Sequence, residues 1–145
     1  MFIFTRQKFS TVEMLDSNTL KAVTAMNDTR HEMIMEVFIT YPEMTIQDIK
    51  AQMLRKPEKE CEPALGNLQK IIGLTIGEGL TKSIREKIGD QNGCTHLTDM
   101  LLESAKAAIQ AQFTLKYQHL SEEHRKQEVQ KVLKDNCVLF AEQKI

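Results

Sequence analysis

A thiol and an imidazole stand two residues apart, at Cys94 and His96, where a glycine-containing turn runs into a long helical pattern. Gly89 and Gly93 bound that turn, and apolar residues at helical spacing begin at Leu97. A cysteine at the start of a helix lies near the positive end of the helix dipole, which favours the thiolate over the thiol. Because the thiolate binds metals and attacks electrophiles, this segment is where the sequence most suggests chemistry.

Metal binding is the first interpretation of this pair. Cys61 also stands at the start of a predicted helix, and His31 stands just before a predicted strand, so both can converge on Cys94 and His96. Thiolates and imidazoles suit zinc and iron–sulfur clusters. We therefore predict a metal site formed by His31, Cys61, Cys94 and His96, holding Zn or an iron–sulfur cluster. The alternative is plain burial, because a free cysteine packs readily as a small apolar side chain.

Nucleophilic catalysis is another interpretation, with Cys94 as the nucleophile and His96 as its base. Such catalysis also needs a group that orients the imidazole and donors that stabilise an oxyanion. The sequence offers Asp90 and Asp99 nearby and identifies no such donors. We therefore expect that the protein is not an enzyme, and a thiol-dependent enzyme centred on Cys94 ranks third among the interpretations.

The elements that must position these residues begin with strands. Apolar and polar residues alternate most clearly from Glu32 to Thr40, and a turn leads into a second run from Thr45 to Arg55. Earlier strands are expected over residues 2–4 and from Leu20 to Met26, with a turn at Asn27-Asp28. These strands predict an antiparallel sheet with one face left for helices to cover.

Helical spacing takes over after Pro57, which ends strand pairing. Four helices are expected: Cys61 to Ile72, Leu80 to Ile88, one that Thr95 or Thr98 caps, and one from Ser121 to Gln143. The predicted fold class is therefore α+β, with an antiparallel sheet of three or four strands covered by three or four helices.

The length of 145 residues fits one domain with a core of its own. We expect that domain to span residues 1–145, with strands mainly in 1–55 and helices mainly in 61–143.

The charge balance argues against nucleic acid and membranes as partners. Nineteen basic residues face twenty acidic ones, and the net charge is -1. No apolar run approaches the roughly 20 residues that a membrane span needs, and the start of the chain lacks the pattern of a signal peptide. Three cysteines are an odd number, which argues against a disulfide framework. A cytoplasmic protein is expected.

The last predicted helix is richer in apolar residues than packing on one small sheet requires. Its apolar positions include Val129, Val132, Leu133 and Phe140. An apolar surplus on a terminal helix is typical of an interface. We therefore expect a homodimer, held partly by residues 127–145. The second interpretation of function is accordingly an accessory module without catalysis, which binds a partner protein through its C-terminal helices.

From about His31 to Phe113 the sequence resembles an uncharacterised bacterial family, a domain of unknown function. The residues that carry the resemblance are His31-Glu-Met33, Pro57-x-x-x-Cys61, Ile72-Gly73-Leu-Thr-Ile76-x-x-Gly79 and Gly93-Cys-Thr-His-Leu97. The resemblance implies a shared fold and no known activity.

A more distant resemblance is to iron–sulfur cluster scaffold proteins of the NifU and IscU type. In those scaffolds an antiparallel sheet precedes a cysteine that leads into a helix, and a later turn with a ligand opens a long alanine-rich helix. Cys61 and His96 fall at the two corresponding places here, and His31 falls where the scaffold has a ligand before its central hairpin. The thiol next to His96 is moved to Cys94. The resemblance implies a metal-binding protein of scaffold type or a sulfur carrier that uses one reactive cysteine.

Overall fold

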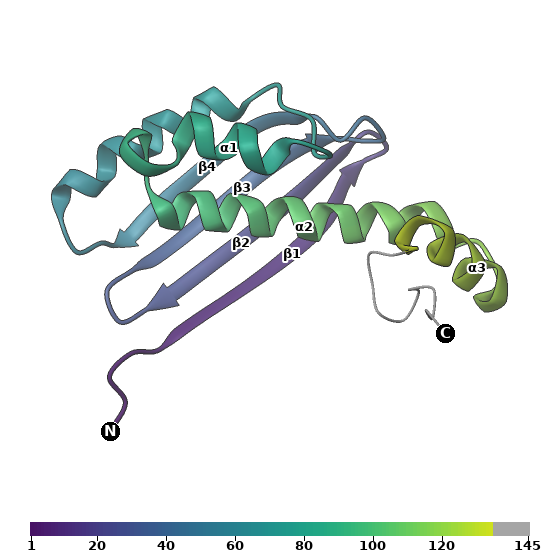
Figure 1. Cartoon of the computed structure of the whole chain (residues 1–145), viewed down its shortest axis with the longest axis horizontal. Helices are drawn as coiled ribbons and strands as arrows, with labels where there is room; N and C mark the ends of the chain where they lie inside the picture. The colour runs from purple at the N-terminus through teal and green to yellow at the C-terminus, as the bar shows by residue number, and fades with distance from the viewer. Residues whose placement is uncertain (135–145) are drawn as a thin grey trace, which may run out of the picture. The chain divides into compact units, whose positions relative to one another are not determined.

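The first half of the chain forms one antiparallel sheet in the computed structural model, which describes residues 1–134 except the side chain of Asn92. The strands lie side by side in the order of the sequence (Figure 1). They are β1 (Arg6–Asp16), β2 (Thr19–Asp28), β3 (Glu32–Thr40) and β4 (Ile46–Arg55). The predicted α+β fold with an antiparallel sheet is therefore confirmed.

Helical segments make up most of the remaining described chain. They are η1 (Lys59–Ile71), α1 (Leu80–Ile88), η2 (Asp90–Asn92), α2 (Thr95–Tyr117) and α3 (Glu122–Leu133), of which η1 and η2 are 3-10 helices. The chain divides into two compact units, Met1–Ile109 and Gln110–Ile145, and α2 continues from the first unit into the second. Within the described chain, none of these helices combines the length and the apolar character of a membrane span.

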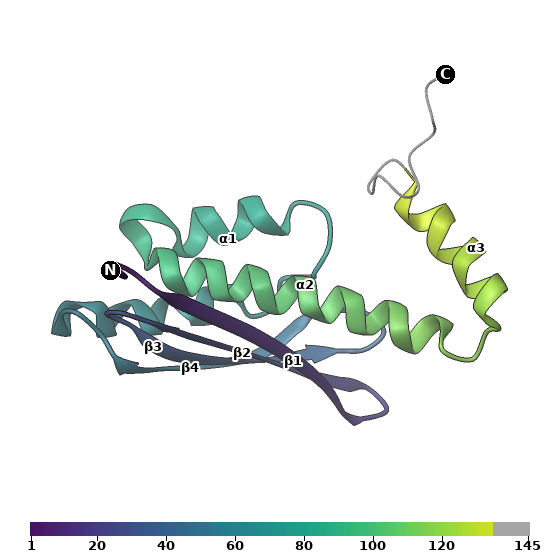
Figure 2. The same cartoon turned by 90° about the horizontal axis from the view of Figure 1, so that it is seen from below.

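The core of the first unit lies between one face of the sheet and the helices. Figure 2 shows α1 and the first part of α2 on the same side of the sheet. The alternation in β3 buries one side chain in two, and the apolar stripe of α2 is buried as predicted. The buried residues of these two elements include Met33, Met35, Val37, Ile39, Leu97, Leu101, Ala105 and Ala108. The strand residues that recur every two positions and the helix residues that recur every 3.6 positions thus pack into one apolar layer.

The first strand is not where the sequence pattern predicts it. Residues 2–4 lie outside the sheet, and β1 begins at Arg6. β1 is an edge strand, and most of its residues are exposed. An edge strand with so little burial has no need of the apolar alternation that marks β3.

Polar side chains connect β1 to α2. Lys8 forms an ion pair with Asp99, with 2.6 Å between Nζ and Oδ2. Further along, Ser10 Oγ lies 2.9 Å from Thr24 Oγ1, which lies 2.8 Å from Ser104 Oγ of α2. The last two hydroxyls are buried, so their hydrogen bonds are costly to lose. These contacts fix the position of α2 along β1.

The second unit is described as far as Lys134. Ser121 caps α3, as predicted, since its side chain accepts a hydrogen bond from the backbone N–H of His124. None of the residues of α3 is buried, and Val132 is 45 % exposed, so the described apolar positions of this helix do not form a core. Phe140 and the predicted continuation to Gln143 lie outside the described residues.

Substitution of Gly93 by Ala tests the close packing that places the start of α2. A Cβ atom at Gly93 would lie 2.0 Å from the carbonyl oxygen of Ile88, a contact that only a backbone shift relieves. We expect Gly93→Ala to lower the free energy of unfolding by about 1–3 kcal/mol. Gly77→Ala is the control, because a Cβ there meets nothing within 4 Å. Urea denaturation measures both, and equal stability of the two variants would contradict this account of the turn.

Candidate functional site

The strongest group of possible ligands is formed by Asp28, His31 and His96. One ligand atom from each side chain lies within 4.8 Å of the others. The two imidazole ring centroids are 4.0 Å apart, with the ring planes tilted by 41°. His31 follows the turn after β2, and His96 lies in the first turn of α2, so the fold joins two residues that the sequence keeps far apart.

Asp28 organises the turn between β2 and β3. Its Oδ1 accepts hydrogen bonds from the backbone N–H groups of Arg30 at 2.8 Å and His31 at 2.7 Å. The same oxygen lies 3.1 Å from Nδ1 of His31. An aspartate that accepts bonds from N–H groups two and three residues later is a common turn-forming device. Asp28 therefore sets both the backbone of the turn and the orientation of the His31 ring.

The other carboxylate oxygen of Asp28 is held from β1. Arg6 donates to Oδ2 from Nε at 2.9 Å and from Nη2 at 2.6 Å. The Asp28 side chain has no exposed surface, and burial alone raises the pKa of a carboxyl group. Here the N–H groups of Arg30 and His31 and the guanidinium of Arg6 outweigh burial, and the pKa of Asp28 falls well below its usual range. Asp28 is a buried, ionised carboxylate.

Arg6 also reaches His96, with 3.1 Å between its Nη2 and Nε2 of the imidazole. Since a guanidinium only donates, Nε2 accepts, and we infer that the ring proton lies on Nδ1. Burial, together with the nearby charges of His31 and Arg6, lowers the pKa of His96. The ring is thus neutral near pH 7, which is the form that binds a metal.

Cys94 lies beside this group and Cys61 lies elsewhere in the fold. Sγ of Cys94 is 3.9 Å from Nδ1 of His96, and the carbonyl of Cys94 accepts the backbone N–H of Thr98, so Cys94 is at the N-terminus of α2 as predicted. Cys61 is half-buried in η1, a segment that packs against β4 and α1. Among the described residues, no set of three ligand atoms within 4.8 Å includes either cysteine.

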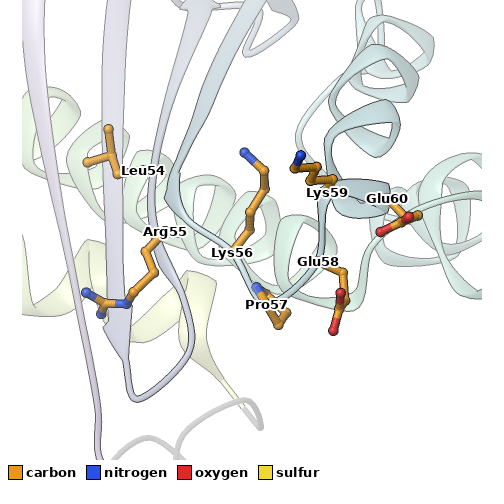
Figure 3. A pocket seen from close by; sticks show the side chains of 7 residues that line it. All are labelled: Leu54, Arg55, Lys56, Pro57, Glu58, Lys59 and Glu60. Atoms are coloured by element: carbon orange, nitrogen blue, oxygen red, sulfur yellow. The ribbon is translucent and has the colours of Figure 1, made fainter.

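The side chains around a hollow that precedes Cys61 in the sequence do not form a group of converging ligands like that of Asp28, His31 and His96. It is lined by residues 54–60, and Figure 3 shows these side chains pointing in different directions rather than converging. Arg55 turns away from the hollow and toward the hairpin of β2 and β3, where Nη2 donates to Asn27 Oδ1 at 2.6 Å and to the carbonyl of Asp28 at 2.8 Å. The role of Arg55 is to hold the turn that carries His31.

Two residues of the site, Asp28 and Arg6, are not identified by the sequence pattern. That pattern predicts only a turn at Asp28 and no strand at Arg6. The signal for Asp28 was its position three residues before His31, a spacing that lets an aspartate cap the turn and meet the ring. Arg6 left no such signal, because its partners lie 22 and 90 residues away.

Replacement of Asp28 by Asn tests the role of the buried carboxylate. We expect Asp28→Asn to lower the free energy of unfolding at pH 7 by about 3 kcal/mol, because Arg6 loses its partner. Asp16→Asn, at the exposed end of β1, is the control. The pKa of Asp28 is lower in the folded protein than its unfolded-state value of about 3.9. The ionised carboxylate therefore stabilises the fold fully above about pH 3.9, and this contribution is lost as the pH falls below that value. The two curves of unfolding free energy against pH should therefore converge below about pH 4, and a constant difference would rule out this role.

Comparison with known proteins assigns the chain to a family. Residues 9–110 match the model described as "Protein of unknown function (DUF2889)". No curated protein and no solved structure matches the chain. The resemblance to iron–sulfur scaffolds therefore stays a prediction. The matched range contains Asp28, His31 and His96 together with both described cysteines, whereas Arg6 precedes it. Because the match spans more than half of the sequence, the chain belongs to the DUF2889 family of proteins of unknown function.

Proposed function

We propose that this protein binds a divalent transition-metal ion, of which Zn²⁺ is the best match, at His31 and His96. The observation that carries the proposal is the convergence of two imidazoles and a carboxylate, with ligand atoms within 4.8 Å of one another. Imidazole and carboxylate donors suit zinc, and two or three protein ligands leave positions for water or a substrate.

Asp28 is better placed to orient the His31 ring than to bind the metal ion itself. Both of its oxygens already accept hydrogen bonds, from the turn on one side and from Arg6 on the other. In metal sites a carboxylate commonly holds Nδ1 of a histidine and leaves Nε2 for the metal. The 3.1 Å approach of Asp28 Oδ1 to Nδ1 of His31 has this form.

Arg6 is the obstacle that an incoming metal ion must overcome. Its Nη2 lies 3.1 Å from Nε2 of His96, the atom that a metal would use. A guanidinium so close to a divalent cation repels it, so binding requires the side chain of Arg6 to turn away from His96. Arg6 is about one-third exposed at 32 %, which leaves its side chain a route into solvent.

The larger site of His31, Cys61, Cys94 and His96, with Zn or an iron–sulfur cluster, stays a second proposal. In its favour, Cys94 already lies next to His96. A cluster held by thiolates would also need Cys61, which lies on η1 outside the His31 and His96 group. A single zinc ion does not need Cys61, and for this reason we favour zinc over a cluster.

A thiol-dependent sulfur carrier or enzyme centred on Cys94 is the alternative that a specific contact favours. His96 Nδ1 lies 3.9 Å from Sγ of Cys94, so an N–H at Nδ1 faces the sulfur and is placed to donate to its thiolate form, whereas taking up the thiol proton requires the other tautomer of the ring. Asp99, which the sequence offered as an orienting acid, is instead paired with Lys8 at 2.6 Å. The homodimer and the accessory role in binding a partner protein stay predictions, since residues 135–145 lie outside the described structure.

Removal of either imidazole tests the zinc site. Full-length protein stripped with a chelator should bind one Zn²⁺, and His31→Ala and His96→Ala should each weaken binding by at least about tenfold. His119→Ala is the matched control, because His119 is exposed in the second unit. Equilibrium dialysis with metal analysis measures the affinity. Equal affinity in all three variants, or no Zn²⁺ bound by the parent protein, refutes the proposal.

Substitution of each cysteine distinguishes the zinc proposal from the proposal of a four-residue site. In the zinc proposal, Cys94→Ala weakens Zn²⁺ binding more than Cys61→Ala does, because only Cys94 lies beside His96. In the four-residue proposal, each substitution abolishes metal binding, since each removes a thiolate ligand. The same dialysis experiment, with iron determined alongside zinc, distinguishes the two.

A further inference from the structure

A cavity of about 350 Å³ opens beside His96, on the side where α1 meets the start of α2. Its size is at the lower end of the range for small-molecule pockets. Its polar lining comes from Arg6, Arg85, Thr95, His96, Thr98 and Asp99. His96 and Arg6 belong to the candidate metal site as well, so the cavity and that site share one wall.

The charges in the cavity leave one cation without a counter-charge. Asp99 is balanced by Lys8 at 2.6 Å, and Arg6 is balanced by the buried Asp28. Arg85 belongs to α1, and within the described part of the chain its guanidinium forms no ion pair or hydrogen bond. Arg85 therefore contributes one uncompensated positive charge, together with up to five N–H donors.

The start of α2 adds to this positive potential. Thr95 and His96 line the cavity and are the first two residues of a 23-residue helix. The N–H groups of a first helical turn have no acceptors within the helix, and the helix dipole adds partial positive charge there. Arg85, an exposed residue with a forked pattern of donors, lines the same cavity as the Thr95 hydroxyl and the helix start, and such a set of groups is suited to an oxyanion.

We propose that this cavity binds a small oxyanion, the phosphate or carboxylate group of a small molecule, through Arg85 and the first turn of α2. Inorganic phosphate does not fill a space of about 350 Å³, so room remains for the rest of a ligand. Anion binding requires no metal. The further consequence, that the anionic group is held next to a metal on His96, rests on the proposed function.

The test is a titration of the metal-free full chain at low ionic strength, first with inorganic phosphate and then with acetate. Two-dimensional ¹H–¹⁵N NMR follows the backbone amides of Thr95 and His96. We expect saturable shifts at these amides, with dissociation constants in the millimolar range, about 1–10 mM. Tighter binding of phosphate or of acetate identifies which oxyanion the cavity prefers.

Variants of α1 decide whether Arg85 carries the binding. Arg85→Gln should weaken it by about tenfold, the loss of one charge-assisted contact. Arg85→Lys, which keeps the charge and loses the fork, should fall between the parent and Arg85→Gln. Lys87→Gln is the matched control, an exposed residue of the same helix with the same change in charge, and it should leave the affinity within about twofold.

Two results overturn the proposal: no saturable shift up to about 50 mM of either anion, or equal weakening by Arg85→Gln and Lys87→Gln, which would show a general charge effect. The dispersed amide spectrum of each variant shows that it is folded. Because no metal is added, failure here leaves the zinc proposal standing, and failure of zinc binding leaves the anion site standing.

Discussion

The structure around the site depends on one buried carboxylate. Asp28 has no exposed side-chain surface, and it stays ionised because two backbone N–H groups and the guanidinium of Arg6 compensate its charge. These same bonds shape the turn between β2 and β3, orient His31, and tie β1 to the sheet. A single side chain thus joins secondary structure, tertiary packing and the geometry of the candidate site. The arrangement of Asp28, His31 and His96 seen in the structure is held by this network.

The second constraint is the docking of α2 on β1. The apolar stripe of α2 packs in the core, while polar contacts to the edge strand fix where along the strand the helix lies. The contact between Arg6 and His96 is at one end of this polar row, and the buried Thr24–Ser104 pair is further along. Apolar packing alone is tolerant of small shifts, whereas hydrogen bonds are directional. The polar row therefore explains how His96 is held close to His31.

Much of the fold could be predicted from the sequence, because buried elements leave periodic patterns. The alternation in β3, the stripe of α2 and the Ser121 cap of α3 all have local signals, and the structure confirms them. β1 could not be placed, since an exposed edge strand carries no such alternation. His31 and His96 were both predicted as site residues and lie together, yet Asp28 and Arg6 were missed because their roles arise from contacts between distant segments. Ion pairs between residues that are far apart in the chain leave no pattern in the neighbouring sequence.

The position of Arg6 on an edge strand links the site to local unfolding of the sheet. β1 is hydrogen-bonded along one side only, and edge elements open at a lower free energy than the central strands of the same sheet. In the closed form, the end of β1 supplies the cation that satisfies Asp28. Local opening of this end of β1 would withdraw that cation from Asp28 and from Nε2 of His96. For the proposed metal site, the apparent affinity would then be the intrinsic affinity multiplied by the population of the open form. Sequence changes far along β1 that alter its pairing would therefore alter metal affinity without touching a ligand.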